Sequence, residues 1–358
     1  MLKYVRPKLR RNGRKLNKRN SFYMMNLGCF VESEIRVSSP VGGLSECFNA
    51  AKIINKFGFY DRLLFFSSLK CTFVAQNITI MTANEVHLIY FSPTHTSKQV
   101  GEAIVRGTGI TNVINTNLTQ QEAQDLVITE SALAIIVVPV YGGRVAPLAM
   151  DRLASVRGNN TPAVIVVVYG NRAYEKSLME LDYWAIQQGF KVIAGATFIG
   201  EHSYSTEKYP VAAGRPDERD LNLAADFGKQ ISDKIASAAE PEKLYAVDVR
   251  KIRRPRQPFF PLFRFLRKVI ALRKSGVPLP RTPWVEDESL CTHCGACAKM
   301  CPVSAIIKGD ELNTDAERCI KCCACVKGCP QKARVYDTPF AVLLSQCFVK
   351  QKDPCTLL

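Results

Sequence analysis

The 358-residue sequence predicts an α/β domain with an open, doubly wound sheet of five parallel strands, followed by a small α+β domain built around cysteines. Residues 85–237 alternate short apolar runs with segments of helical periodicity, which is typical of such a sheet. Nine of the 14 cysteines fall in the windows 291–301 and 319–329, and eight of these nine share one repeated spacing. The length allows about two domains. The expected boundaries are a basic N-terminal extension at 1–83, the α/β domain at 84–240, a basic Pro-rich linker at 241–281, the cysteine domain at 282–340 and a tail at 341–358.

Five apolar runs supply the strands. The third and fourth runs are β-branched and apolar on both faces, as strands in the middle of a buried parallel sheet must be. The second is weak. The expected strands are Glu85–Phe91, Asn112–Asn115, Ser131–Val140, Pro162–Tyr169 and Lys191–Ile199.

Helix signals lie between these strands. Thr119-x-x-Glu122 matches a capping box and predicts a helix start. Tyr174–Gln188 has helical periodicity and ends at Gly189, a C-cap candidate. Asp217–Ala239 carries an apolar stripe on one face. This alternation of strands and helices favours crossover connections on both faces of the sheet.

Composition excludes collagen-like, low-complexity and wholly disordered chains. Apolar residues make up 47% and charged residues 22%, which is ordinary for a globular chain. No run approaches the roughly 18–20 apolar residues of a membrane span. The net charge is +16, but residues 1–80 alone carry 14 basic and 4 acidic side chains. The basic excess therefore belongs mostly to the N-terminal part, and with no recognition module we expect no nucleic-acid partner.

The cysteines form an internal repeat. Cys291-x-x-Cys294-x-x-Cys297-x-x-x-Cys301-Pro and Cys319-x-x-Cys322-x-x-Cys325-x-x-x-Cys329-Pro are offset by 28 residues. A tight loop with a cysteine at every third position presents three thiolates to one iron–sulfur cube, and the fourth cysteine ligates the other cube. We therefore expect two [4Fe–4S] clusters. Their ligand sets are Cys291, Cys294, Cys297 and Cys329 for the first, and Cys319, Cys322, Cys325 and Cys301 for the second.

This repeat resembles the two-cluster bacterial ferredoxins over about residues 285–337. Zinc is the alternative, but zinc sites normally use two ligand pairs separated by a longer loop. Cys323 stands where Gly295 stands in the first loop, and we expect it to be a packed neighbour of the cluster and not a ligand. His293 is expected to be an exposed loop residue, with tuning of the cluster as the alternative.

The loop after the first strand carries hydroxyl groups and opens a helix. It reads Ser92-Pro-Thr94-His95-Thr96-Ser97-Lys98. Hydroxyls and backbone N–H groups at a helix N-terminus attract a phosphate group. The sequence lacks both the Gly-x-x-x-x-Gly-Lys of P-loops and the Gly-x-Gly-x-x-Gly of dinucleotide folds at this place.

This loop resembles the phosphate loop of flavodoxins, which bind FMN. In that family a Gly usually stands where His95 is, which matters if the position needs a left-handed backbone. The resemblance implies that Tyr141-Gly142-Gly143 and Tyr169-Gly170-Asn171, with Tyr174, flank the flavin ring after the third and fourth strands. His202 and Tyr204 border that pocket or belong to an ordinary loop, and the second alternative is favoured.

The whole pattern resembles a bacterial family of flavodoxin–ferredoxin fusion proteins, over about residues 84–340. The phrases FSPTHTSK, VPVYGGRVAP and VVVYGNRAYE and the cysteine repeat carry this likeness. It implies an electron-transfer iron–sulfur flavoprotein with two [4Fe–4S] clusters and FMN. The alternative is a ferredoxin-type carrier whose α/β domain binds no flavin and docks a partner. If the protein is an enzyme, it is an FMN-dependent oxidoreductase. Redox proteins or a small-molecule electron acceptor are the expected partners, in the cytoplasm.

The linker and the two ends are less informative. Residues 249–285 contain 11 basic and no acidic side chains. The segment Pro258–Ser275 is favoured as a helix that packs across the α/β domain through Leu262, Leu266, Val269 and Ile270. A membrane surface and an acidic redox partner are the alternatives. Residues 1–80 resemble a transit peptide, but a start at Met81 is favoured, and the C-terminal match of Cys355-Thr-Leu-Leu to a prenylation box is taken as chance.

Overall fold

The computed structural model describes residues 83–358 apart from 121–123, 239–243 and 277, and all described residues belong to one unit of the chain, 76–358. The expectations for residues 1–80 and for Met81 lie outside the described residues. Among the described residues, no helix is long and apolar enough to cross a bilayer.

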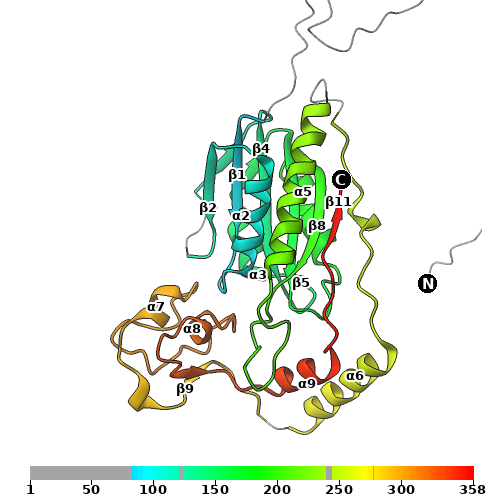
Figure 1. The fold of residues 1–358 in the computed structure, drawn as a ribbon. Coiled ribbons are helices and arrows are strands. Elements are labelled where there is room, and N and C mark those ends of the chain that lie inside the picture. Colours follow the sequence, from blue (N-terminus) through cyan, green and yellow to red (C-terminus); the bar gives the residue numbers. More distant parts are fainter. Residues whose placement is uncertain (1–82, 121–123, 239–243, 277) are drawn as a thin grey trace, which may run out of the picture. The chain divides into compact units, whose positions relative to one another are not determined.

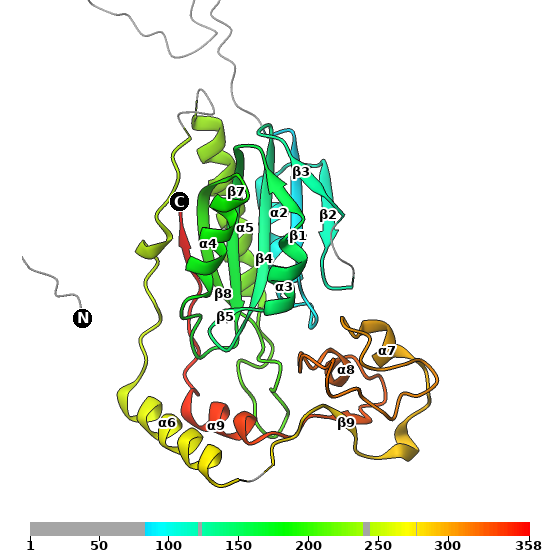
Figure 2. The same ribbon diagram turned by 180° about the vertical axis from the view of Figure 1, so that it is seen from behind.

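The α/β domain is built around a mainly parallel sheet (Figures 1 and 2). Its strand order is β2-β1-β4-β7-β8-β11, with β5 paired to β4 off this path. The parallel strands are β1 (Glu85–Tyr90), β2 (Val113–Asn117), β4 (Ala132–Tyr141), β7 (Thr161–Tyr169) and β8 (Phe190–Ile199). Numbered along the chain, these five strands have the order 2-1-3-4-5, which is the flavodoxin-like order. The predicted fold class is therefore confirmed.

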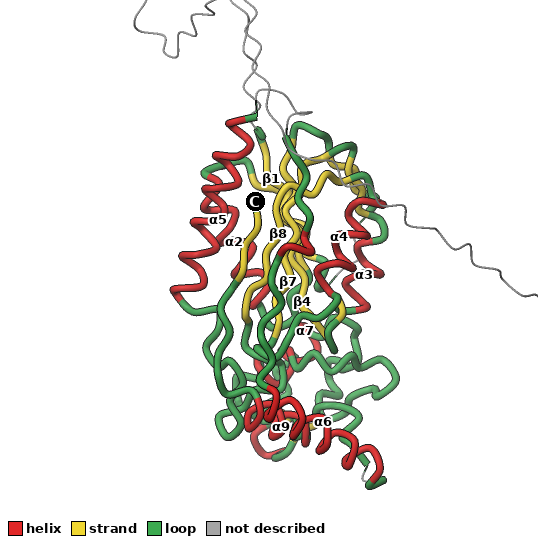
Figure 3. The backbone as a smooth tube through the Cα atoms, turned by 90° about the vertical axis from the view of Figure 1, so that its right-hand side faces the viewer, coloured by secondary structure: helices red, strands yellow, loops and turns green. Residues whose placement is uncertain are grey.

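Helices cover both faces of this sheet (Figure 3). One face packs against α2 (Thr96–Thr108) and α5 (Glu218–Ser237), and the other against α3 (Pro147–Leu153) and α4 (Ser177–Gln187). All nine residues of β7 are buried, as a strand covered on both faces requires. Asp217 caps α5 through a reciprocal capping box with Asp220.

The prediction of a helix that begins after Thr119 is wrong. The described residues of this connection form a turn and then the short strand β3 (Leu126–Ile128), which pairs in parallel with β6 (Val156–Gly158). Thr119 Oγ1 instead accepts a hydrogen bond from Ser92 N at 2.8 Å, so its side chain supports the loop after β1. Glu122 lies outside the described residues.

The C-terminal half contains shorter elements. The helices are α6 (Phe259–Lys274), α7 (Ala296–Met300), α8 (Ala324–Lys327) and α9 (Pro339–Cys347), with 3-10 turns at Val249–Lys251 and Glu288–Leu290. Its strands are β9 (Trp284–Val285), β10 (Arg334–Val335) and β11 (Cys355–Leu357), whereas β5 (Arg144–Val145) belongs to the α/β domain and pairs with β4. The tail thus returns to the α/β domain, because β11 adds an antiparallel strand at the β8 edge. That strand was not predicted.

The expected packing of the linker helix is only partly right. In α6, Leu262 and Phe265 pack beside Val211 and residues of α9, whereas Leu266 and Ile270 stay about half exposed. The helix therefore rests mainly on α9, and of the expected stripe Leu262 is packed whereas Leu266 and Ile270 are not.

Candidate functional site

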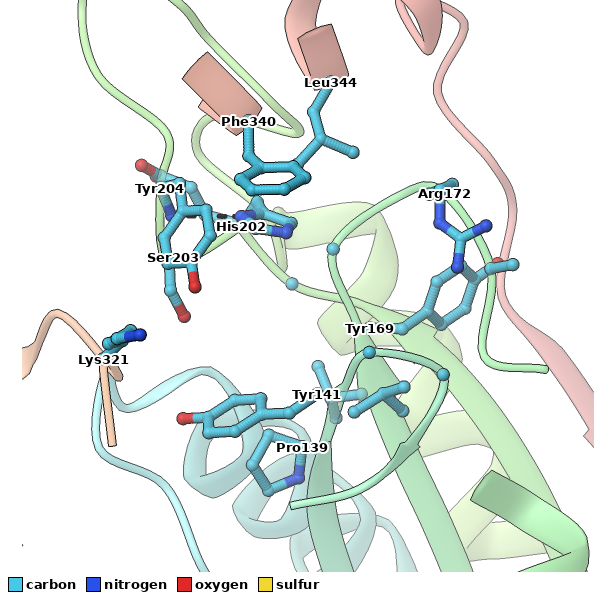
Figure 4. Close-up of a pocket in the computed structure, with 18 of the residues that line it drawn as sticks. Pro139, Tyr141, Tyr169, Arg172, His202, Ser203, Tyr204, Lys321, Phe340 and Leu344 are labelled. Carbon is cyan, nitrogen blue, oxygen red and sulfur yellow. Dashed lines mark hydrogen bonds between the residues drawn. The ribbon is translucent and has the colours of Figure 1, made fainter. Parts of the chain in front are cut away.

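A large cavity of about 660 Å³ lies at the ends of β1, β4, β7 and β8 (Figure 4). Parallel strands carry their carboxyl ends to one edge of the sheet, where α/β proteins usually bind ligands. Nine of the twelve expected cofactor-binding residues line it: Ser92, Thr94, Thr96, Ser97, Tyr141, Gly142, Gly143, Tyr169 and Gly170.

The loop between β1 and α2 closes one end of this cavity. Ser92 Oγ accepts a hydrogen bond from Lys98 N at 3.0 Å, which folds the loop over the start of α2. His95 occupies a left-handed conformation with φ of 66°. The position therefore has the backbone for which Gly is usual, and His95 adopts it with its side chain exposed.

This folding leaves hydrogen-bond donors for an anion. Within the described part of the chain, no partner accepts from the backbone N–H groups of Thr94, Thr96 and Ser97. The Ser97 hydroxyl is fully buried, and likewise finds no hydrogen-bond partner among the described residues. Buried polar groups normally have partners. A phosphate group accepting from these donors, at the positive end of α2, would satisfy them.

The loops after β4 and β7 form the walls. Gly142 and Gly143 have positive φ, and a Cβ added at Gly142 would meet no protein atom within 4 Å. A ligand can therefore approach the backbone closely at Gly142. A Cβ added at Gly170 would lie 2.3 Å from the ring of His202. Glycine at this position therefore allows the loop after β8, which carries His202, to approach the loop after β7.

His202 lines the cavity together with Tyr204, so the favoured expectation of an ordinary loop is wrong. The Nδ1 atom of His202 accepts a hydrogen bond from Tyr204 N at 3.0 Å, so the neutral ring carries its proton on Nε2. Burial, aided by the positive charges of Lys327 and Arg172, lowers the pKa of His202 to about 4. The residue is therefore an uncharged hydrogen-bond donor at neutral pH.

Three expected residues do not line the cavity. The buried side chain of Asn171 donates to Phe348 O at 2.8 Å and accepts from Lys352 N at 2.9 Å, so it holds the C-terminal tail. Tyr174 packs edge-on against Tyr169 and donates to Ile252 O. His95 contributes its backbone conformation only. For these three, the expected side-chain contact with a ligand is not what the structure shows.

The cysteines surround two further cavities. Cys291, Cys294, Cys297 and Cys329 line one, and Cys301, Cys319, Cys322 and Cys325 line the other, as expected from the repeat. All eight are free thiols. Among the described residues, no group of three or more His, Cys, Asp or Glu could hold a single metal ion.

The chemistry of both cysteine sets fits iron–sulfur cubes. Ala305 N donates to Cys301 Sγ at 3.2 Å, and backbone N–H groups also reach the sulfurs of Cys297, Cys319 and Cys322. Such bonds stabilise the negative sulfur of a cluster. Burial raises the pKa of Cys322 to about 12, so ligation must displace its proton.

The repeat extends to the backbone. Gly295 and Cys323 hold equivalent places, and both have left-handed φ values, 73° and 58°. Cys323 is buried beside the second cysteine set, and its Sγ lies 3.6 Å from Lys321 O. His293 pairs with the buried Glu311 at 3.1 Å and keeps about half of its side chain exposed.

The second cysteine loop is part of the large cavity. Ile320 and Lys321, which lie between two of its cysteines, line that cavity. Tyr141 on the opposite wall has a pKa well above its usual value, because of burial and of the nearby thiols of Cys322 and Cys323. The second cysteine set therefore adjoins the cavity wall.

Polar contacts attach the cysteine segment to the α/β domain. Buried Arg152 donates to Leu118 O, Thr119 O and, across to the cysteine segment, Pro302 O at 2.5 Å. Lys327 pairs with Glu201 and donates to Ser205 O at 2.7 Å.

Sequence reasoning missed several residues of the site. Arg334 is buried and lines the first cysteine cavity, and its charge opposes the rise that burial causes in the pKa of Cys297 and Cys325. Its position shortly after the second Cys-Pro pair gave no signal of this role. Sequence reasoning also missed eight residues that line the large cavity at the strand ends. Most of them come from α6 and α9: Arg172, Phe265, Leu266, Val269, Ile270, Arg273, Phe340 and Leu344.

Comparisons with known proteins directly support the interpretation of the cysteine segment as an iron–sulfur domain. The family described as 4Fe-4S binding domain matches residues 284–307, which contain the first four cysteines of the repeat. No curated protein matches the chain.

Similar solved structures are distant. A flavodoxin from the domain Archaea is 14% identical, covers 42% of this chain and 98% of its own, and has a TM-score of 0.30. A Streptococcus pneumoniae flavodoxin is 16% identical and covers 42% and 99%, with a TM-score of 0.32. Rubredoxin oxygen:oxidoreductase from Desulfovibrio gigas is 16% identical and covers 47% and 38%, with a TM-score of 0.31. These scores are low, and the flavodoxin-like fold rests on the strand order.

The chain thus joins an α/β domain of flavodoxin-like topology to a ferredoxin-type 4Fe-4S domain. This architecture fits a flavodoxin–ferredoxin fusion.

Proposed function

We propose that the protein binds two [4Fe–4S] clusters and one FMN and passes electrons between them. The observation that carries this proposal is the shared cavity wall. The hydroxyl loop of residues 92–97 and the cluster-loop residues Ile320 and Lys321 line one cavity. When bound, FMN exchanges one or two electrons, whereas each cluster exchanges one.

Named residues would hold each group. The Ser97 hydroxyl and the free N–H groups of Thr94, Thr96 and Ser97 would receive the phosphate. The loops at 141–143 and 169–170 would flank the ring. His202 Nε2–H would donate to a polar atom of the bound ligand. The two cysteine sets would hold the clusters, and buried Arg334 would offset part of their negative charge.

Reconstitution tests the proposal. Anaerobically purified protein is incubated with FMN, passed through a desalting column and examined by absorbance and flavin fluorescence. We expect about one FMN per chain with quenched fluorescence beside the broad iron–sulfur band. Flavin-free protein after this treatment would reject the proposal in favour of a ferredoxin whose α/β domain docks a partner.

A further inference from the structure

Helix α6 carries two apolar stripes, and only one of them is covered. The inner stripe includes Leu262 and Phe265, which pack beside α9, with the Phe265 and Phe348 rings 5.2 Å apart. The outer stripe follows helical spacing and consists of Phe259, Phe263, Leu266 and Ile270. An ordinary surface helix has one apolar stripe, which faces the core.

The outer stripe is exposed along its whole length. Phe259 is 75% exposed, Phe263 54%, Leu266 48% and Ile270 53%, and the adjoining Phe260 is 80% exposed. The Phe259 and Phe263 rings are parallel and 6.4 Å apart, so they form one continuous apolar surface. A contiguous exposed patch of this kind marks an interaction site.

Positive charge surrounds the stripe. Five of the 16 residues of α6 are basic, namely Arg264, Arg267, Lys268, Arg273 and Lys274. None of them forms an ion pair with any residue that the structure describes. The surrounding segment 249–285 holds 11 basic and no acidic side chains. Its partner should therefore be anionic as well as apolar.

We propose that the outer stripe of α6 docks this protein on the surface of an anionic phospholipid bilayer. The aromatic side chains enter the boundary between headgroups and acyl chains, and the flanking cations pair with lipid phosphates. Residues 1–80 and a second copy of α6 are poor alternatives, because both are strongly basic and would repel this helix.

Docking would bring the bilayer next to the large cavity. Leu266 and Ile270 belong both to the outer stripe and to the cavity lining. The proposal does not depend on whether the cavity holds FMN, so it can fail or succeed independently of the proposed function.

Flotation with vesicles tests the proposal on the full-length protein. We expect co-flotation with vesicles of phosphatidylcholine mixed with phosphatidylglycerol, and much weaker binding to phosphatidylcholine alone. Phe259→Ala with Phe263→Ala should weaken binding about tenfold or more. Arg267→Gln with Lys274→Gln should weaken it about fivefold for each charge removed. Val127→Ala, which truncates another exposed apolar side chain, is the matched control and should leave binding unchanged.

A second measurement reports the position of the stripe. In Phe263→Trp, the fluorescence of the new indole should shift to shorter wavelength on anionic vesicles and be quenched by brominated lipid. The exposed position in Tyr183→Trp should show neither change.

Three outcomes would overturn the proposal. They are no binding of the wild type to anionic vesicles at low salt, equal binding by the Phe259→Ala, Phe263→Ala variant, and indole fluorescence in Phe263→Trp that is already shifted without vesicles. The second outcome would assign binding to another segment, and the third would mean that a protein segment or a second copy covers the stripe.

Discussion

The two cysteine loops share their spacing and backbone but differ in exposure. In the first loop Cys294 is exposed, whereas its equivalent Cys322 in the second loop is buried. The first loop has Gly295 at its left-handed position, and the second has the buried Cys323. The second loop also supplies Ile320 and Lys321 to the large cavity.

This difference suggests that the two clusters would differ in how well the protein shields them from solvent. The first cysteine loop is the more exposed, and the second adjoins the large cavity. The same local sequence pattern fixes the ligands in both loops, whereas contacts with the α/β domain decide which set is shielded. The predictions below test this difference in shielding, from the largest expected effect to the smallest.

Removing one ligand from each set should remove one cluster. We expect Cys294→Ser and Cys322→Ser each to lose about half of the iron and sulfide. The iron left in Cys294→Ser belongs to the buried set and should resist a chelator longer than the iron left in Cys322→Ser. Iron and sulfide assays over time measure both effects, and equal chelation rates would contradict the difference in shielding.

Loosening the attachment of the cysteine segment should be the next largest effect. Arg152→Met removes three hydrogen bonds from a buried guanidinium, including the one to Pro302 O, and should cost about 2–4 kcal/mol of unfolding free energy. Denaturant titration measures this cost. Arg157→Met, at an exposed arginine, is the control and should change stability by less than about 0.5 kcal/mol.

A single substitution in the hydroxyl loop should have a smaller effect than the loss of Arg152, and we expect it in the affinity for FMN. Ser97→Ala removes a buried hydroxyl that would donate to the phosphate, and it should weaken FMN binding about 10- to 100-fold. Ser203→Ala lies on the opposite wall and should change the affinity by about threefold or less. Fluorescence titration with FMN compares them, and unchanged binding in Ser97→Ala would place the phosphate elsewhere.

His202 should make stability depend on pH. Its pKa of about 4 in the folded chain lies below the usual 6.5, so between these values the unfolded chain takes up a proton that the folded chain resists. Stability is therefore lost as pH falls from about 6.5 to about 4. Between pH 7 and pH 5 the wild type should lose up to about 2 kcal/mol more than His202→Gln. Equal losses in denaturant titrations at both pH values would show that His202 is not shielded.

The smallest effect, on the iron and sulfide content, is expected for Cys323, which follows the expected cluster ligand Cys322. Cys323→Ser should retain all the iron and sulfide, in contrast to its neighbour in Cys322→Ser, because spacing and geometry make Cys323 a packing residue. Iron loss equal to that of Cys322→Ser would break the ligand assignment.

Features encoded locally were predictable from the sequence. Continuous apolar runs predicted β4 and β7, and cysteine spacing predicted which cysteines would surround each cavity. Left-handed positions were also readable, because His95 stands at a place where Gly is usual and adopts the same backbone.

Features that depend on distant contacts were not predictable. Thr119 looked like a helix cap, but its hydroxyl serves the loop after β1. Asn171 looked like a ligand contact, but its amide holds the tail that supplies β11. The contribution of α6 and α9 to the cavity, and the burial of Arg334, arise only when the chain is folded.

The most direct test of the account is the cofactor content of one anaerobic sample of the full-length chain. After treatment with iron, sulfide and FMN, we expect about eight iron, about eight sulfide and about one FMN per chain. A folded protein that holds no more than about four iron, or no flavin, would contradict the central claim that two clusters and a flavin share this chain.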